Sequence, residues 1–106
     1  MPKTIRVYWK ARHGRELISF QWPAIRADST VLVSACEYRP SDPGGIPDTD
    51  CDRIVGPVNV WVSNVAPHGG DRPGVTFVVN VDSDYPIPVA TDITVLDDVP
   101  IDVEHE

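Results

Sequence analysis

The chain has 106 residues, and its 16 acidic side chains outnumber its 9 basic ones, which gives a net charge of −7. This length favours a single domain over residues 1–106 with one modest core. The acidic balance disfavours nonspecific binding to nucleic acid, and no apolar run approaches the ~20 residues of a membrane span, so we expect neither partner. The opening residues lack the apolar stretch of a secretory signal, and the sequence assigns no localisation.

Valine dominates the apolar residues, with sixteen valines beside three leucines and one methionine. β-Branched side chains favour strands, and no stretch keeps the apolar spacing of three and four that a helix needs. Eleven prolines and seven glycines interrupt the chain about as often as an all-β domain turns. We therefore predict antiparallel strands and no substantial helix.

The first two predicted strands, 4–11 and 15–22, flank His13 and Gly14, a dipeptide suited to a two-residue hairpin turn. Alternation places one apolar set of side chains on a single face of this ribbon and the cations on the other face. The apolar set comprises Ile5, Val7, Trp9, Ile18, Phe20 and Trp22. The sequence thus predicts that both tryptophans enter the core and that the two strands pair with each other.

The rest of the chain reads as short extended segments separated by turns. The expected strands are 30–38, 53–55, 58–65, 75–81 and 89–96, with 97–106 as an acidic tail or a short last strand. Six to seven antiparallel strands of this length predict a single β-sandwich of immunoglobulin-like or related topology. A flattened barrel or a jelly roll is the alternative.

The long loop between the third strand and the short segment alternates Asp48, Asp50 and Asp52 around a cysteine. Alternating carboxylates can supply oxygen ligands to Ca²⁺, but the helical calcium loop also needs a glycine and a glutamate, and this chain has Arg53 and Asn59 at those positions. A solvated turn is therefore favoured over a calcium site. We expect no metal and no cofactor.

Cys36 and Cys51 bracket most of the same loop. A disulfide between them would tether it, and closing such a loop is worth about 3 kcal/mol in the chain-entropy treatment. Two separate thiols, as in a reducing compartment, are the alternative. The sequence favours the disulfide.

No catalytic constellation stands out in the sequence. His13, His68 and His105 lie far apart and show no metal-ligand spacing, and none neighbours a cysteine. A catalytic centre needs a nucleophile or base with an orienting partner, or convergent metal ligands. We therefore expect a protein that is not an enzyme.

Cations gather in the first part of the chain. Residues 1–26 carry a net charge of +5, whereas residues 54–106 carry −8. The predicted hairpin would place two arginines opposite each other near the turn. It would also form a basic surface with one aromatic ring among the cations. This basic surface comprises Arg6, Tyr8, Lys10, Arg12, His13 and Arg15. An acidic protein or another copy of the chain would suit this surface.

Trp61 is a second candidate binding residue. Val60 and Val62 point inward in the predicted strand, so Trp61 points outward with Asn59 and Ser63. An aromatic ring between small polar groups suits a protein interface or stacking against a sugar.

Three functions remain open. The favoured hypothesis is a non-catalytic interaction module that binds a protein through loops, a strand edge or an aromatic face. The second is a structural subunit of a larger assembly, such as a virion, tail or surface layer, held by complementary charges. The third is a secreted carbohydrate-binding module that uses Trp61 and Tyr38.

Overall fold

The structure is a computed structural model that describes residues 2–40, 51–96 and 99–104. Within these ranges the chain is all-β and contains no helix, as predicted. The strands are β1 Lys3–Arg12, β2 Gly14–Gln21, β3 Thr30–Arg39, β4 Asp52–Ile54, β5 Val60–His68, β6 Gly74–Val81 and β7 Ile87–Leu96. Because the described segments hold no helix, no helix there could cross a membrane.

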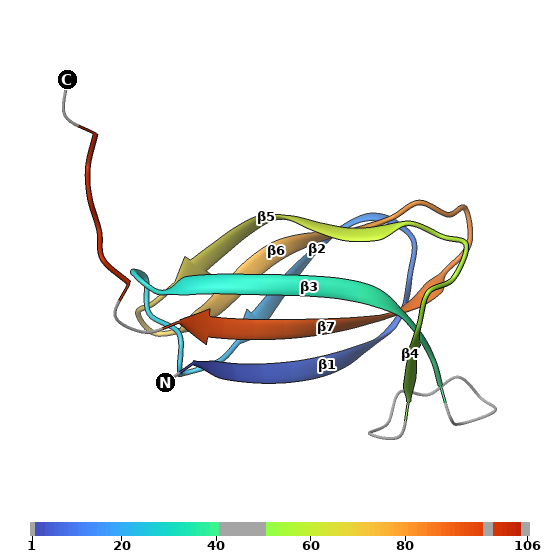
Figure 1. Ribbon diagram of the computed structural model, residues 1–106, viewed down its shortest axis with the longest axis horizontal. Coiled ribbons are helices and arrows are strands. Elements are labelled where there is room, and N and C mark those ends of the chain that lie inside the picture. The colour runs from blue at the N-terminus through green and yellow to red at the C-terminus, as the bar shows by residue number, and fades with distance from the viewer. Residues whose placement is uncertain (1, 41–50, 97–98, 105–106) are drawn as a thin grey trace.

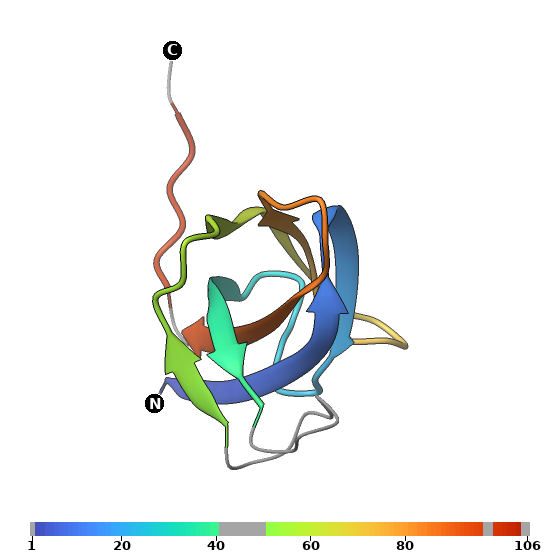
Figure 2. The ribbon, with the colours of Figure 1, turned by 90° about the vertical axis from the view of Figure 1, so that its right-hand side faces the viewer.

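The strands form two antiparallel sheets that pack face to face, so the predicted sandwich or barrel-like architecture is confirmed. One sheet has the order β1-β7-β3-β4 and the other has the order β2-β6-β5. In Figure 1, β1, β7 and β3 lie in front of β5, β6 and β2. Figure 2 looks along the strands and shows both sheets curving around a common interior.

The core is built from the alternating inward side chains of the two central strands. Val75, Phe77 and Val79 of β6 are fully buried, and so are Val89 and Ile93 of β7. Each of these strands has a hydrogen-bonded neighbour on both sides, which explains why their inward residues lose all contact with solvent. Ile18 of β2 and Val31 of β3 are buried as well, and the other inward apolar residues of β1, β2, β3 and β5 are partly buried and pack against this centre.

The predicted pairing of the first two strands is wrong. β1 pairs with β7 and β2 pairs with β6, so the two strands belong to different sheets although only His13 separates them. Their inward faces nevertheless oppose each other across the core, and the rings of Trp9 and Phe20 meet edge to face at 6.2 Å between centroids. Trp9 and Trp22 both pack against the core, as predicted.

Backbone conformation at the corner explains the difference. Gly14 has a φ of 69°, but His13 is not among the residues with positive φ. The two-residue hairpin turn suggested by His-Gly, type I′, needs positive φ at both positions. A bulge between Trp9 and Arg12 also shifts the register of β1 with β7 just before the corner. The chain therefore passes from one sheet to the other instead of folding back.

The two sides of the sandwich differ. On one side β3 and β5 approach each other, and β4 pairs with residues 37–39 of β3. On the other side β1 and β2 diverge once they leave the corner. Along that side, Ile5, Val7 and Trp9 of β1 and Phe20 of β2 pack against the core but are only partly buried.

Residues 99–104 form no strand and run away from the sheets, as Figures 1 and 2 show. The alternative of a short last strand is therefore not seen in this part of the tail. Its apolar side chains stay in solvent: Val99 is 40% exposed, Ile101 77% and Val103 68%.

Candidate functional site

The outer face of the β2-β6-β5 sheet carries the clearest exposed apolar surface. Trp61 is 50% exposed and Leu17 is 70% exposed, so the predicted outward position of Trp61 is confirmed. Leu17 pairs in register with Val78, which is buried although it also points outward. Arg15 and Trp61 both pair with Asn80, one on each side, so they lie in one row across the sheet. We call Arg15, Leu17, Trp61, Val78 and Asn80 the Trp61 face.

The structure thus brings together two residues that the sequence had assigned to separate surfaces. Arg15 was expected at the basic tip of a hairpin, and Trp61 on the outward face of the strand 58–65. The pairing of β2 with β6, and of β6 with β5, sets them two strands apart, which is ~10 Å. Arg15 forms no ion pair with any residue in the described ranges.

The polar side chains on the Trp61 face are used within the protein. Asn80 donates from Nδ2 to the Trp61 carbonyl oxygen at 3.3 Å and to Ser63 Oγ at 3.1 Å. Ser19 and Thr76, farther along the same face, share a hydrogen bond of 2.7 Å between their hydroxyl groups. The surface therefore offers apolar contact and one cation, but few open hydrogen-bonding groups.

His68 is engaged on both sides of its ring. Its Nδ1 lies 2.8 Å from the Arg72 carbonyl oxygen, and its Nε2 lies 3.3 Å from Thr76 Oγ1. A carbonyl can only accept, so Nδ1 carries the hydrogen and Nε2 accepts from the threonine hydroxyl. His68 thus holds the 69–73 turn against β6, which leaves neither ring nitrogen open as a catalytic base.

Arg6 lies on the outer face of the other sheet, in an ion pair with Asp92. Arg6 Nε contacts Asp92 Oδ1 at 2.7 Å and Arg6 Nη2 contacts Oδ2 at 3.2 Å, while Arg53 Nη1 contacts Oδ2 at 3.0 Å. The hydrogen bonds from Arg6 hold the pKa of the Asp92 carboxyl below its usual value, with Arg53 adding to the effect. Beside this cluster is a pocket of about 170 Å³ that Cys36 also lines.

Tyr8 is covered by neighbours and does not stand open between cations. Its ring meets the Tyr38 ring at 5.0 Å between centroids, with an interplanar angle of 63°. The Tyr8 hydroxyl donates to the Cys51 carbonyl oxygen at 3.4 Å, and the Tyr38 hydroxyl donates to the Trp9 carbonyl oxygen at 2.6 Å. The two tyrosines therefore tie β1, β3 and the start of β4 together.

Arg12 lies at the corner between the sheets. Its guanidinium carbon is 5.4 Å from the centroid of the Trp9 ring, and Nη1 is 3.7 Å from Glu16 Oε2. His13 and Lys10 are exposed beside it. The structure therefore divides the expected basic surface: Arg6 and Tyr8 on one sheet, Arg15 on the other, and the remainder at the corner.

Cys36 and Cys51 are not disulfide bonded, so the favoured reading of the cysteines is wrong. In the β3–β4 register, Arg39 pairs with Asp52 and Glu37 with Ile54, which sets the two cysteines at opposite ends of the paired segment. Four residues along a strand separate them by ~13 Å, whereas a bridge needs Cα atoms within ~7 Å. Burial raises the pKa of the Cys36 thiol.

The suggested calcium ligands are not assembled in the described part of the chain. Asp48 and Asp50 lie outside the described residues, and Asp52 is exposed in β4. Nowhere in residues 2–40, 51–96 and 99–104 do three metal-type side chains converge.

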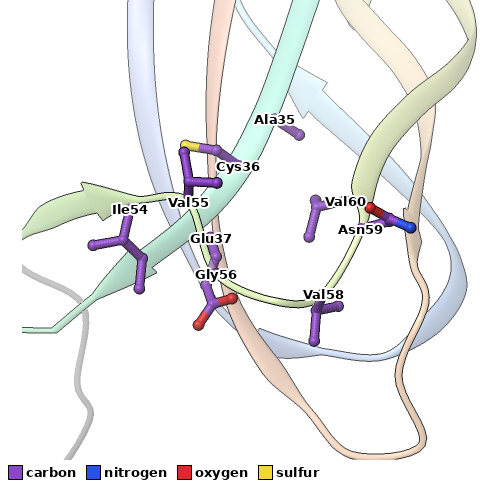
Figure 3. A pocket seen from close by; sticks show the side chains of 9 residues that line it. All are labelled: Ala35, Cys36, Glu37, Ile54, Val55, Gly56, Val58, Asn59 and Val60. Atoms are coloured by element: carbon purple, nitrogen blue, oxygen red, sulfur yellow. The ribbon is translucent and has the colours of Figure 1, made fainter.

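Sequence reasoning missed Glu37, which lines a pocket of about 210 Å³. Figure 3 shows the pocket where the chain from Ile54 to Val60 passes the end of β3. Glu37 Oε1 is buried and has no hydrogen-bond partner among the residues that the structure describes, and a Cβ on Gly56 would overlap this carboxylate. The signal was in the alternation of β3, because Glu37 follows the inward residues Val33 and Ala35 at the same spacing.

Comparisons with protein-family models, with curated proteins and with solved structures find no match for this chain.

Proposed function

We propose that this protein is a non-catalytic interaction module whose Trp61 face binds a protein partner. The observation that carries the proposal is the exposure of Leu17 and Trp61 on the two strands that flank β6, with Leu17 opposite the buried Val78 and Trp61 opposite Asn80. Large apolar side chains grouped on one face of a small domain are characteristic of binding surfaces. Tryptophan is also among the residues that most often dominate the binding energy of protein interfaces.

The polar groups of this face favour a protein over a sugar. A sugar ligand needs several open donors and acceptors around the aromatic ring, and the Asn80 amide hydrogens already bond to Trp61 and Ser63. Arg15, in contrast, lies in the row of Trp61 without a carboxylate partner in the described ranges. A partner that offers an apolar cluster beside an acidic group matches this arrangement.

The non-catalytic part of the proposal is supported by His68. Both of its ring nitrogens hold the 69–73 turn. An immunoglobulin-like relationship, expected from the sequence, stays a prediction.

The Trp61 face is tested by affinity capture with the full chain, followed by measurement of Kd for each captured protein in purified form. Trp61→Ala should weaken a true partner by roughly tenfold to a hundredfold, since such interface residues contribute about 2 kcal/mol or more. Arg15→Glu should weaken it further if the partner is acidic. Val55→Ala is the matched control, because Val55 is a fully exposed apolar residue away from this face.

Equal affinity of the wild-type protein and Trp61→Ala for every purified partner would overturn the proposal. A change in tryptophan fluorescence on titration with glycans, lost in Trp61→Ala, would instead establish the carbohydrate-binding alternative.

A further inference from the structure

The outer edge of β1 is open. β1 is the terminal strand of its sheet, and within the described ranges its only hydrogen-bonded neighbour is β7. An exposed edge presents unpaired backbone N–H and C=O groups that can accept another strand. Because β1 and β2 diverge beyond the corner, the inward residues beside this edge are only partly buried. They are Ile5, Val7 and Trp9 on β1, with Phe20 and Trp22 opposite.

The tail has the pattern of a strand that lacks a sheet. Val99, Ile101 and Val103 alternate with Pro100, Asp102 and Glu104, and the three apolar side chains are 40%, 77% and 68% exposed. Alternation of this kind gives an extended segment one apolar and one polar face. In this structure the apolar face contacts no core.

From these two features we infer that residues 99–104 of one copy of the chain pair, as an added strand, with the outer edge of β1 in a second copy. The apolar face of the tail would then cover the partly buried apolar side chains beside the edge of β1. The polar face would continue the outer surface of the β1-β7-β3-β4 sheet. This inference does not depend on the proposed role of the Trp61 face.

Charge favours β1 over the other side of the sandwich. Lys3 and Lys10 lie on β1 and form no ion pair with any carboxylate in the described ranges, whereas Arg6 of the same strand is already paired with Asp92. The tail brings Asp102 and Glu104. β5, in contrast, has no lysine or arginine, and β3 already approaches it.

Pro100 is compatible with an added strand. Proline has no N–H, so sheets accept it at an edge position where the nitrogen side faces solvent. The docked tail would itself be the new edge. Residues 99–104 extend ~20 Å, which is shorter than the ten residues of β1.

The length of chain after β7 favours pairing of the tail with β1 of a second copy over pairing with β1 of the same copy. The tail follows Leu96 at the end of β7, and β1 lies directly beside β7 with Lys3 opposite Val95. To reach the far edge of β1, the same chain must cross β1, a distance of two strand spacings or ~10 Å. Only two residues separate Leu96 from Val99 in the sequence, and the three Cα–Cα steps span at most ~11 Å, which leaves no length for reversal.

The test is the solution mass of the full chain by light scattering over a wide range of concentrations. The wild-type protein should reach at least twice its monomer mass of 11.7 kDa. Ile101→Asp places a charge on the apolar face of the tail, and this variant should stay monomeric. Val55→Asp makes the same change at a fully exposed site outside the tail, and it should assemble like the wild type.

Hydrogen exchange locates the acceptor strand. Backbone amides of β1 that do not bond to β7 should be protected in the assembled wild type and lose this protection in Ile101→Asp. A wild-type protein that is monomeric throughout, or an Ile101→Asp variant that assembles normally, would overturn the inference. Protection that appears on β2 or β5 instead of β1 would show that β1 is not the acceptor strand.

Discussion

Gly74 occupies a position where the backbones of β2 and β6 come unusually close. A Cβ built there would overlap the Phe20 carbonyl oxygen and lie 2.9 Å from the Gln21 Cα atom. These atoms belong to the paired strand and cannot rotate away as a side chain could. At Gly14, in contrast, φ is 69° but no atom lies within 4 Å of the Cβ position. The two glycines are therefore required for different physical reasons.

We predict that Gly74→Ala destabilises the protein more than Gly14→Ala. Alanine at Gly14 should cost about 1 kcal/mol through its positive φ alone. Alanine at Gly74 should cost about 2–3 kcal/mol, because the strands must shift to make room. Urea unfolding of the two variants measures both values. Equal costs would show that the close approach of the backbones is relaxed in solution.

The ionised carboxyl of Asp92, on the outer face of the β1-β7-β3-β4 sheet, contributes to the stability of the folded protein. Since hydrogen bonds from Arg6 hold its folded-state pKa below the unfolded value of ~3.9, folding favours the ionised form. The resulting stabilisation is fully present above the unfolded pKa and disappears as pH falls through the folded pKa.

We predict that Asp92→Asn lowers Tm by a few degrees near neutral pH, on the order expected for a loss of about 1 kcal/mol or less in a chain of this size. The difference from the wild type should begin to shrink as pH falls below the unfolded value of ~3.9, and it should vanish only below the lower folded-state pKa, where the native carboxyl is protonated as well. Thermal unfolding between acidic and neutral pH measures this. Asp28→Asn is the control, because Asp28 and Arg26 form an ion pair in which both side chains are largely exposed.

At the scale of the strands, the sequence predicted the segments and their inward faces well. The valine pattern indicated β3, β6 and β7 to within two residues, and their inward side chains are those that alternation selects. Alternation reports which face of a strand is buried, because side chains point to opposite faces in turn. It carries no information on which neighbour supplies the hydrogen bonds.

The pairing of β1 and β2 shows this limit. Two apolar faces can share one side of a hairpin or oppose each other across a sandwich, and the residue pattern is the same in both. One signal against the hairpin was present: it would have set Arg12 opposite Arg15, a like-charge pair. In the structure Arg12 turns to Trp9 and Glu16, while Arg15 lies on the outer face of the other sheet.

The turn between β5 and β6 depends on His68 rather than on its glycines alone. We predict that His68→Ala speeds amide exchange in residues 69–72, because the imidazole joins the Arg72 carbonyl to the Thr76 hydroxyl. Global stability should fall by only about 1 kcal/mol, the typical net value of a hydrogen bond. Exchange measured residue by residue tests this, with His13→Ala as the control at an exposed histidine. Unchanged exchange in the turn would show that the glycines suffice.

Across the whole molecule, the two oppositely charged parts of the sequence do not form separate bodies. β1, from the basic part, lies against β7, from the acidic part, and Arg6 meets Asp92 across that pairing. The candidate site was partly predictable, because Trp61 followed from alternation. Its companions did not follow, because only the order β2-β6-β5 brings Arg15 and Leu17 onto its face.

The register of β1 with β7 also fixes where a longer chain or a tag would emerge. Lys3 lies opposite Val95, so the first and last strands begin and end at one pole, while the His13 corner occupies the other. Trp61 lies next to the start of β5, in the row of Arg15, close to the corner pole. Immobilising the protein through either terminus should therefore leave the Trp61 face pointing away from the support. A further domain fused at either terminus would likewise lie at the pole away from Trp61.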